Sequence, residues 1–250
     1  MYNLINLFLL LSLAALCLAR DFDFFFFVQQ WPASYCDSRK GCCYPKTGKP
    51  AEDFSIHGLW PNYEDGTYPS NCDSSNSFDK SEHRRELAGR SAKSGGADLR
   101  PDKQNAKGLA YPCLPSGDGY KFWGHEWEKH GTCSESVLDQ HGYFQTALGL
   151  KNKSNLLSTL QSAGIWPANG RYHTLNSIKE AIEGALGVTP YIECNVDPAG
   201  NHQLYQVYLC VDSSASDFME CPVMPHGRPC GSKIEFPSFS DLTDDERDEL

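Results

Sequence analysis

Residues 121–133 read KFWGHEWEKHGTC, and residues 55–63 upstream read SIHGLWPNY. A helix turns by about 100° per residue. A helix over 123–130 therefore brings four polar residues to one face: His125, Glu126, Lys129 and His130. Trp127 points to the opposite side, as expected of a side chain that anchors the helix in a core. Two imidazoles, a carboxylate and an ammonium group on one face predict a site for chemistry on an anion.

This segment has two other interpretations. A zinc site of the H-E-x-x-H kind needs histidines four residues apart, but His125 and His130 are five apart and the spacing of four pairs His125 with Lys129. The segment therefore does not predict a metal site. A solvated, salt-bridged helix face would explain the charged residues. It would not explain two histidines next to aromatic residues and followed by Gly131 and Cys133.

Both segments resemble a known family. HEWEKHGTC and IHGLWPNY match, nearly letter for letter, the two active-site segments of the T2 ribonuclease family, and FVQQWPASYC at 27–36 is similar to the first strand of its plant members. The resemblance covers about Asp21 to Phe239. It implies an endoribonuclease that cleaves single-stranded RNA to 2',3'-cyclic phosphates and then to 3'-phosphates, with no metal and no other cofactor. The S-like branch of plant members fits best, since self-incompatibility relatives are typically basic.

The resemblance also implies the roles of the catalytic side chains. His130 is expected to be the general base and His57 the general acid, because imidazole exchanges protons near working pH. His125 is expected to hold a phosphate oxygen. Lys129 and Glu126 are expected to stabilise the transition state. A catalytically silent storage or binding protein of the same fold is the alternative, although all three histidines are present.

The strand that carries His57 predicts how bases are bound. In a regular strand, His57 and Leu59 share one side. Trp60 and Tyr63 follow, and flat aromatic rings near an imidazole suit stacking on a nucleobase. Gln30 closes an apolar strand, where polar side chains are often half-exposed, and the resemblance puts it near a base subsite. The expected substrate-binding residues are Gln30, Trp60, Asn62, Tyr63 and Phe122.

The N-terminal residues 1–19 contain an apolar run without a charged side chain, too short to span a bilayer. We interpret them as a signal peptide cleaved before Arg20; a retained membrane anchor is the less favoured alternative. The expected organisation is a signal peptide over 1–19, a T2-type ribonuclease domain over 20–240 with a flexible insertion over 91–108, and an acidic tail over 241–250.

Eleven cysteines are present, and removal of Cys17 with the signal peptide leaves ten. An even number in a secretory protein predicts a disulfide framework, whose connectivity counting cannot give. The resemblance implies five pairs: Cys36 with Cys42, Cys43 with Cys113, Cys72 with Cys133, Cys194 with Cys230, and Cys210 with Cys221.

Hydrophobic periodicity predicts helices over 137–152, 154–164 and 174–187, the second capped by Ser154 and the third by Thr174. Strand-like runs lie at 21–32, 190–197 and 203–212. Helices interleaved with such strands predict an α+β domain with an antiparallel central sheet, flanking helices and disulfide staples.

The formal net charge of −10 argues against a nucleic-acid packaging role, since such binding depends on Lys and Arg. Asn152 begins an N-glycosylation sequon, usable if its loop is exposed. The C-terminal RDEL resembles an ER-retrieval tetrapeptide. We therefore expect a monomer in the ER lumen that uses a retrieval receptor, with the vacuole or the extracellular space as the alternative.

Overall fold

The computed structural model describes residues 21–39, 52–81 and 120–238. The expected signal peptide, the insertion over 91–108 and the acidic tail all lie outside these residues. The strands are β1 (Phe24–Gln30), β2 (Ser55–Asn62), β3 (Ala168–His173), β4 (Tyr191–Val196), β5 (His202–Asp212), β6 (Phe218–Met219) and β7 (Ile234–Phe236). The helices are α2 (Pro32–Cys36), α4 (Tyr120–Lys129), the 3₁₀ turn η1 (Gly131–Ser134), α5 (Gln140–Ser154), α6 (Leu156–Ser162) and α7 (Leu175–Leu186).

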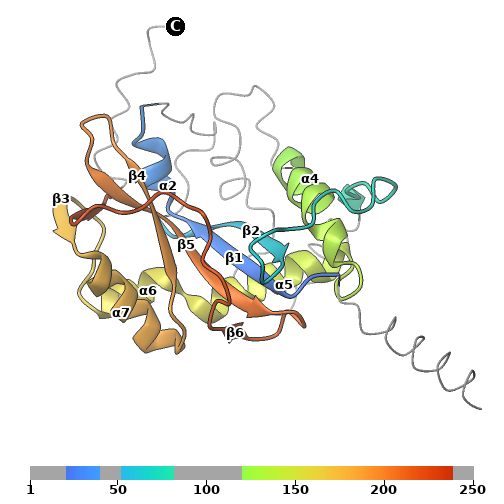
Figure 1. The fold of residues 1–250 in the computed structure, drawn as a ribbon. Helices are drawn as coiled ribbons and strands as arrows, with labels where there is room; N and C mark the ends of the chain where they lie inside the picture. The colour runs from blue at the N-terminus through green and yellow to red at the C-terminus, as the bar shows by residue number, and fades with distance from the viewer. Residues whose placement is uncertain (1–20, 40–51, 82–119, 239–250) are drawn as a thin grey trace, which may run out of the picture.

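The strands form one sheet, with β1 and β5 side by side at its centre (Figure 1). The main order is β2-β1-β5-β7-β3, and β4 and β6 also pair with β5. Every pairing is antiparallel except that of β5 with β7, which is parallel. The prediction of an α+β domain with flanking helices and disulfides is confirmed, with this one parallel pairing added.

Strand β1 is buried on both faces. Its four consecutive phenylalanines, Phe24 to Phe27, are all at most 6% exposed, which is why the segment is a continuous apolar run and not an alternating one. Phe25 and Phe27 join the main core, whereas Phe24 and Phe26 join a smaller cluster with Tyr208. We call the side of Phe25 and Phe27 the helix face, and the side of Phe24 and Phe26 the histidine face.

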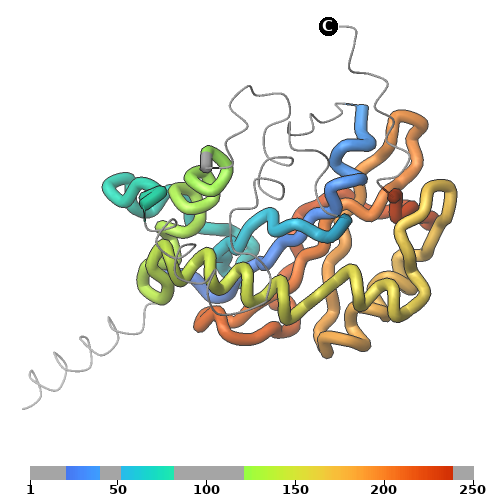
Figure 2. Tube along the Cα trace, turned by 180° about the vertical axis from the view of Figure 1, so that it is seen from behind, coloured from blue at the N-terminus to red at the C-terminus, as the bar shows by residue number. Residues whose placement is uncertain are grey.

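The helix face is covered by α5, α6 and α7, whose apolar residues share the main core with it. Figure 2 shows α5 and α6 running across the strands. Helix α7 begins after Thr174, whose hydroxyl accepts a hydrogen bond from the Ser177 backbone at 3.1 Å, and ends at Gly187 with φ +73°. Both ends are as predicted, because a threonine cap and a left-handed glycine satisfy the terminal backbone groups.

The predicted break between α5 and α6 is wrong in detail. Helix α5 starts at Gln140, capped by Asp139, and continues through Ser154. Asn155, with φ +33°, separates it from α6. Ser154 is therefore the buried last residue of α5 and not the cap of the next helix.

Three of the expected disulfides are formed: Cys72–Cys133, Cys194–Cys230 and Cys210–Cys221. Cys36 is also disulfide-bonded, but its expected partner Cys42 lies outside the described residues. Both cysteines of the expected pair Cys43–Cys113 also lie outside them. Over the described ranges, the structure contains no helix long and apolar enough to cross a membrane.

Candidate active site

Helix α4 is anchored by Trp127. Its side chain is fully buried, and its indole nitrogen donates to the backbone oxygen of Asn76 at 3.0 Å. A Cβ on Gly131 would lie 2.2 Å from the Trp127 ring, so only glycine fits there. The helix ends at Lys129, and His130 follows it directly, still bonded through its backbone nitrogen to the Glu126 oxygen at 3.0 Å. The prediction of Trp127 as the anchor is confirmed, while His130 lies just beyond the helix.

The loop that contains Asn71 and Cys72 is bonded to the chain at the C-terminal end of α4. Cys72 is joined to Cys133, and the Cys72 backbone nitrogen donates to the Thr132 hydroxyl at 3.2 Å. The Asn71 backbone nitrogen donates to the Lys129 oxygen at 2.9 Å. These bonds hold the turn around His130 against a second segment of chain, which preorganises the position of that imidazole.

His57 lies at a β-bulge. Val28 pairs with Gly58 and Gln29 pairs with Ile56, which leaves His57 as an extra residue without a partner on β1. Regular alternation would have put His57 on the side of Leu59, which is fully buried in the main core. The expectation that His57 and Leu59 share a side is therefore wrong, because the bulge turns His57 toward the histidine face.

The two histidines meet at one aromatic ring. The centroids of the His57 and Trp60 rings are 5.0 Å apart, and those of Trp60 and His130 are 5.2 Å apart with nearly parallel planes. The Trp60 ring also packs against Tyr208, at 6.1 Å between centroids. The structure thus brings imidazoles from a strand and from a helix end to the same indole.

Glu126 holds this indole in place. The Trp60 indole nitrogen donates to the Glu126 Oε2 at 2.8 Å, and Glu126 is only 5% exposed. A Cβ on Gly58 would lie 2.1 Å from the Trp60 nitrogen and 2.4 Å from that carboxylate oxygen. Gly58 is therefore needed so that the hydrogen bond can cross the strand. The bond joins the two sequence segments that were singled out separately.

Burial changes the pKa values of the two histidines that contact Trp60. Burial and, to a smaller extent, the nearby charges of Lys129, His125 and His57 together lower the pKa of His130 to about 3. Burial also lowers the pKa of His57, although a hydrogen bond to Gln206 and the charge of Glu193 act in the opposite direction. His130 is therefore neutral over most of the acidic range, whereas His57 keeps two contacts that favour its charged form.

His125 and Lys129 complete the polar cluster on α4. His125 is exposed and Lys129 is partly buried. Burial and the charge of Lys129 lower the pKa of His125. Burial raises the pKa of Glu126 to about 7, against the hydrogen bond from Trp60 and the charge of Lys129. Three of the residues expected to be catalytic thus contact Trp60: His57, Glu126 and His130. The charges of the other two, His125 and Lys129, influence both His57 and His130.

The expected base-binding residues differ in their contacts and in their burial. Phe122 stacks on His57, with 6.2 Å between ring centroids. Asn62 is buried, and its amide donates to the Trp60 backbone oxygen at 2.7 Å. Tyr63 packs against the main core. Gln30 was expected to be half-exposed but is 3% exposed, and its amide nitrogen is buried without a hydrogen-bond partner in the described structure.

Two residues of the cluster were missed from the sequence. Tyr68 is 57% exposed, and its ring centroid lies 6.5 Å from that of His130. It lies outside the 55–63 segment, in a loop without a periodic pattern, so no sequence signal marked it. Gln206 lies 149 positions from His57 in the chain, yet its side-chain oxygen is 3.0 Å from the His57 Nδ1. Among the residues that the structure describes, no group of three His, Cys, Asp or Glu could hold a metal ion.

Comparisons with known proteins show the family to which the chain belongs. A family model described as Ribonuclease T2 family matches residues 22–221. Intracellular ribonuclease LX of Solanum lycopersicum is 60% identical over 249 residues, which are 99% of this chain and 97% of the relative. Extracellular ribonuclease LE of the same plant is 55% identical over 241 residues, 94% of this chain and 97% of the relative.

A solved structure, RNase NT in complex with 5'-AMP, superposes with a TM-score of 0.76 at 58% identity, covering 86% of this chain and 98% of that one. The chain belongs to the Ribonuclease T2 family. It is an endoribonuclease of that family, with relatives among both intracellular and extracellular plant ribonucleases.

Proposed function

We propose that this ribonuclease cleaves single-stranded RNA by transphosphorylation, with His130 as general base and His57 as general acid. His130 takes the proton of the 2'-hydroxyl, the 2'-oxygen attacks phosphorus, and His57 gives a proton to the departing 5'-oxygen. The product is a 2',3'-cyclic phosphate, which water then opens to a 3'-phosphate. The observation that carries the proposal is that both imidazoles contact the Trp60 ring, His57 from β2 and His130 from the end of α4.

The pKa values support this division of roles. A pKa of about 3 makes His130 a free base at working pH. The general acid must be protonated, and the Gln206 and Glu193 contacts favour the protonated form of His57 against its burial. Since the pKa of His57 stays below its ordinary 6.5, we expect kcat/KM to have an acidic optimum. Its acid limb should lie near pH 3 and its alkaline limb below pH 6.5, as macroscopic values of the coupled pair.

Lys129 supplies positive charge for the phosphate, and His125 holds one of its oxygens. Both lie on α4 next to His130, and neither is fully buried, so a phosphate oxygen can reach them. Glu126 has a double task in this scheme. Its Oε2 anchors Trp60, and its carboxyl contributes a hydrogen bond to the transition state. Positive charge and hydrogen bonds aimed at the developing phosphorane lower its free energy.

Single-stranded RNA offers unstacked bases to the aromatic rings of the site. Trp60 and Phe122 lie against the catalytic imidazoles, where they are available to stack on the bases that flank the cleaved bond. Gln30 contributes its unpaired amide nitrogen as a donor to a base. Asn62 holds the Trp60 backbone through its hydrogen bond. Tyr63 packs against the main core, so its proposed contact with a base has the least support.

The test uses two oligonucleotides of the same sequence, one of RNA and one of DNA, with the purified mature protein. We expect cleavage of the RNA with 2',3'-cyclic ends detected by mass spectrometry, and no cleavage of the DNA, which lacks the attacking hydroxyl. A chelator should leave the rate unchanged, since neither step requires a metal. Cleavage of the DNA, or a rate that EDTA abolishes and zinc restores, would contradict the scheme.

We further propose that the protein acts as a monomer in the secretory pathway, retained in the ER lumen by its C-terminal RDEL. The disulfides support an oxidising compartment. The vacuole and the extracellular space are the alternatives, to be distinguished by microscopy of chains with and without the last four residues. Loss of retention on deleting RDEL is the expected result.

Asn152 is proposed as a glycan acceptor, with a restriction that comes from the fold. The sequon was expected in a loop but occupies the last turn of α5. Asn152 is exposed, whereas the Ser154 hydroxyl is buried and bonded to Gln29 at 2.8 Å and to the Leu150 oxygen at 2.9 Å. A transferase that must reach this hydroxyl can do so only before α5 packs. Modification of Asn152 therefore has to precede folding.

A further inference from the structure

The sheet has a second irregularity, between β4 and β5. On β5, Gln206 pairs with Glu193 of β4, and the next pair joins Leu204 to Cys194, so that Tyr205 is an extra residue. On its other side, β5 keeps a regular register, with Gln206 opposite Gln30 of β1. The bulge brings the side chains of Tyr205 and Gln206 next to each other, as bulges do near functional sites.

Gln206 is well placed to act on His57. It is 5% exposed, and it lies on the histidine face, two residues from Tyr208. Its side-chain oxygen is 3.0 Å from the His57 Nδ1. Burial raises the pKa of Tyr205, and a hydrogen bond from Gln206 acts against this rise. The amide oxygen of Gln206 is the end that faces the His57 ring.

An amide oxygen can only accept a hydrogen bond. The His57 Nδ1 must therefore carry a proton in the neutral as well as in the charged ring, and the nitrogen that gains and loses a proton is Nε2. We propose that Gln206 is a positioning residue, which fixes the tautomer and the ring orientation of His57 so that Nε2 delivers the proton to the leaving oxygen.

The choice of an amide in place of a carboxylate has a chemical consequence. Hydrogen bonding orients the ring, but a neutral partner adds no full negative charge that would hold the imidazolium. The charged groups that influence His57 are Glu193 on β4 and His125 and Lys129 on α4. Glu193 itself is bonded to the Tyr208 hydroxyl at 2.8 Å. Gln206 thus orients His57 while leaving it able to release its proton.

This inference rests on the general-acid role proposed for His57, and two substitutions test it. Gln206→Leu removes the acceptor, and we expect kcat to fall by about 10- to 100-fold, the usual effect of removing such a supporting contact, with KM nearly unchanged. Gln206→Glu keeps an acceptor and adds a charge. We expect it to retain most of kcat and to move the alkaline limb of kcat/KM upward by about one pH unit or more, because an opposite charge favours the imidazolium.

The control is Gln203→Leu. Gln203 is a buried glutamine of the same strand whose amide donates to Asp37 instead of to a histidine. It should change thermal stability without moving the pH profile. A merely structural role for Gln206 would give the same result as this control, so a Gln206→Leu enzyme with wild-type kcat, or a Gln206→Glu enzyme with an unmoved alkaline limb, would overturn the proposal.

If Gln206→Leu does not fold, a measurement on the wild-type protein still tests the proposal. This measurement requires no enzymatic activity. ¹⁵N NMR of the wild-type protein, above the pKa of His57, should show the neutral ring protonated at Nδ1. Protonation at Nε2 would overturn the proposal even if His57→Ala is inactive. Full activity of His57→Ala would instead overturn the general-acid assignment, so the two failures are distinguishable.

Discussion

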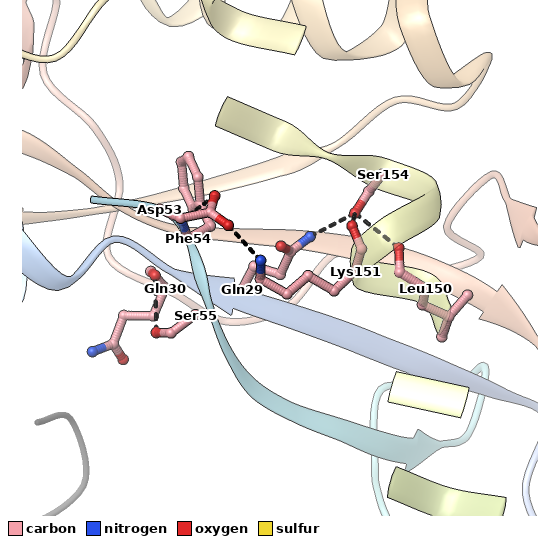
Figure 3. Close-up of polar contacts among 8 residues, drawn as sticks. All are labelled: Gln29, Gln30, Asp53, Phe54, Ser55, Leu150, Lys151 and Ser154. Atoms are coloured by element: carbon pink, nitrogen blue, oxygen red, sulfur yellow. Dashed lines mark hydrogen bonds and ion pairs between the residues drawn. The ribbon is translucent and has the colours of Figure 1, made fainter. Parts of the chain in front are cut away.

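Gln29 and Gln30 are neighbours on β1, and both are buried, yet they belong to different parts of the molecule. Figure 3 shows their side chains leaving the strand on opposite sides. The Gln29 amide donates to the Ser154 hydroxyl at 2.8 Å on the helix face. The Gln30 amide nitrogen, on the histidine face, has no hydrogen-bond partner among the described residues. Adjacent residues of one type thus differ in what their polar groups are used for.

The surroundings of the two glutamines show the same contrast. Near Gln29, Lys151 and Asp53 form an ion pair (Figure 3). On the histidine face, the His130 Nδ1 and the Gln30 amide remain unpaired within the described residues. Unpaired buried polar groups lower stability. A fold tolerates them where a ligand supplies the missing partner, so the helix face provides stability and the histidine face provides chemistry.

The sharpest test of this contrast is removal of a catalytic imidazole. His57→Ala and His130→Ala should each lower kcat by about two to four powers of ten, since each removes a proton-transfer group. For His130→Ala, thermal stability should change little, because His130 has an unpaired buried nitrogen and a depressed pKa. Steady-state kinetics on RNA and thermal melts measure the two quantities. His141→Ala, on the exposed side of α5, is the control; near wild-type kcat in either active-site variant would show that a role is misassigned.

The helix face should respond in the opposite way. Phe27 is fully buried in the main core, and Phe27→Ala should lower the free energy of unfolding by about 3–5 kcal/mol through lost burial and a cavity. The folded enzyme should keep its kcat when assayed well below its melting temperature. Tyr172→Ala is the control, since Tyr172 is 41% exposed on β3 and its loss should change stability by at most about 0.5 kcal/mol. A large loss of kcat with Phe27→Ala would show that the helix face also contributes to catalysis.

Much of this arrangement could be predicted from local sequence. The spacing in 121–133 predicted the polar face of α4 and the anchoring of Trp127, because helical periodicity is a local property. Thr174 and Gly187 bounded α7 for the same reason. The family resemblance then selected His57 as the partner of His130. These elements depend on residues close to each other in the chain or on motifs of several consecutive letters.

The rest depends on register between distant strands. His57 was expected beside Leu59, and only the shift between Val28 and Gln29 on β1 turns it to the other face. The contact with Gln206 joins His57 on β2 to a residue on β5, with β1 between the two strands. Ser154 resembled a helix cap, whereas its hydroxyl is used by Gln29. Bulges and cross-strand bonds of this kind leave no periodic signal, so they could not be read from the sequence.

The two glutamines allow a smaller and more specific test. Gln29→Leu removes a buried hydrogen bond and should lower the free energy of unfolding by about 0.5–1.5 kcal/mol, with kcat and KM unchanged. Gln30→Leu removes an unpaired group, so stability should be equal or higher, while KM for RNA should rise about two- to tenfold if its amide binds a base. Urea denaturation and initial rates measure both. The substitutions are identical and adjacent, so each is the control for the other, and a reversed pattern would mean that the faces are misassigned.

The last test concerns the pH dependence of stability on the histidine face. Burial raises the pKa of Glu126 from 4.5 to about 7. Between these values the unfolded chain has lost the proton that the folded chain retains. The folded state therefore binds more protons, and the stability due to this group is present at low pH and is lost as the pH rises through the window.

Glu126→Gln removes this titration but keeps an oxygen that can accept the Trp60 indole hydrogen. The free energy of unfolding of the variant, relative to the wild type, should therefore be higher at pH 7.5 than at pH 4.5. Urea denaturation at the two pH values measures the difference, with Glu128→Gln, an exposed carboxylate on the same helix, as the matched control. If the variant and the wild type differ by the same amount at both pH values, the proton does not reside on Glu126, and the buried carboxylate that anchors Trp60 is ionised throughout.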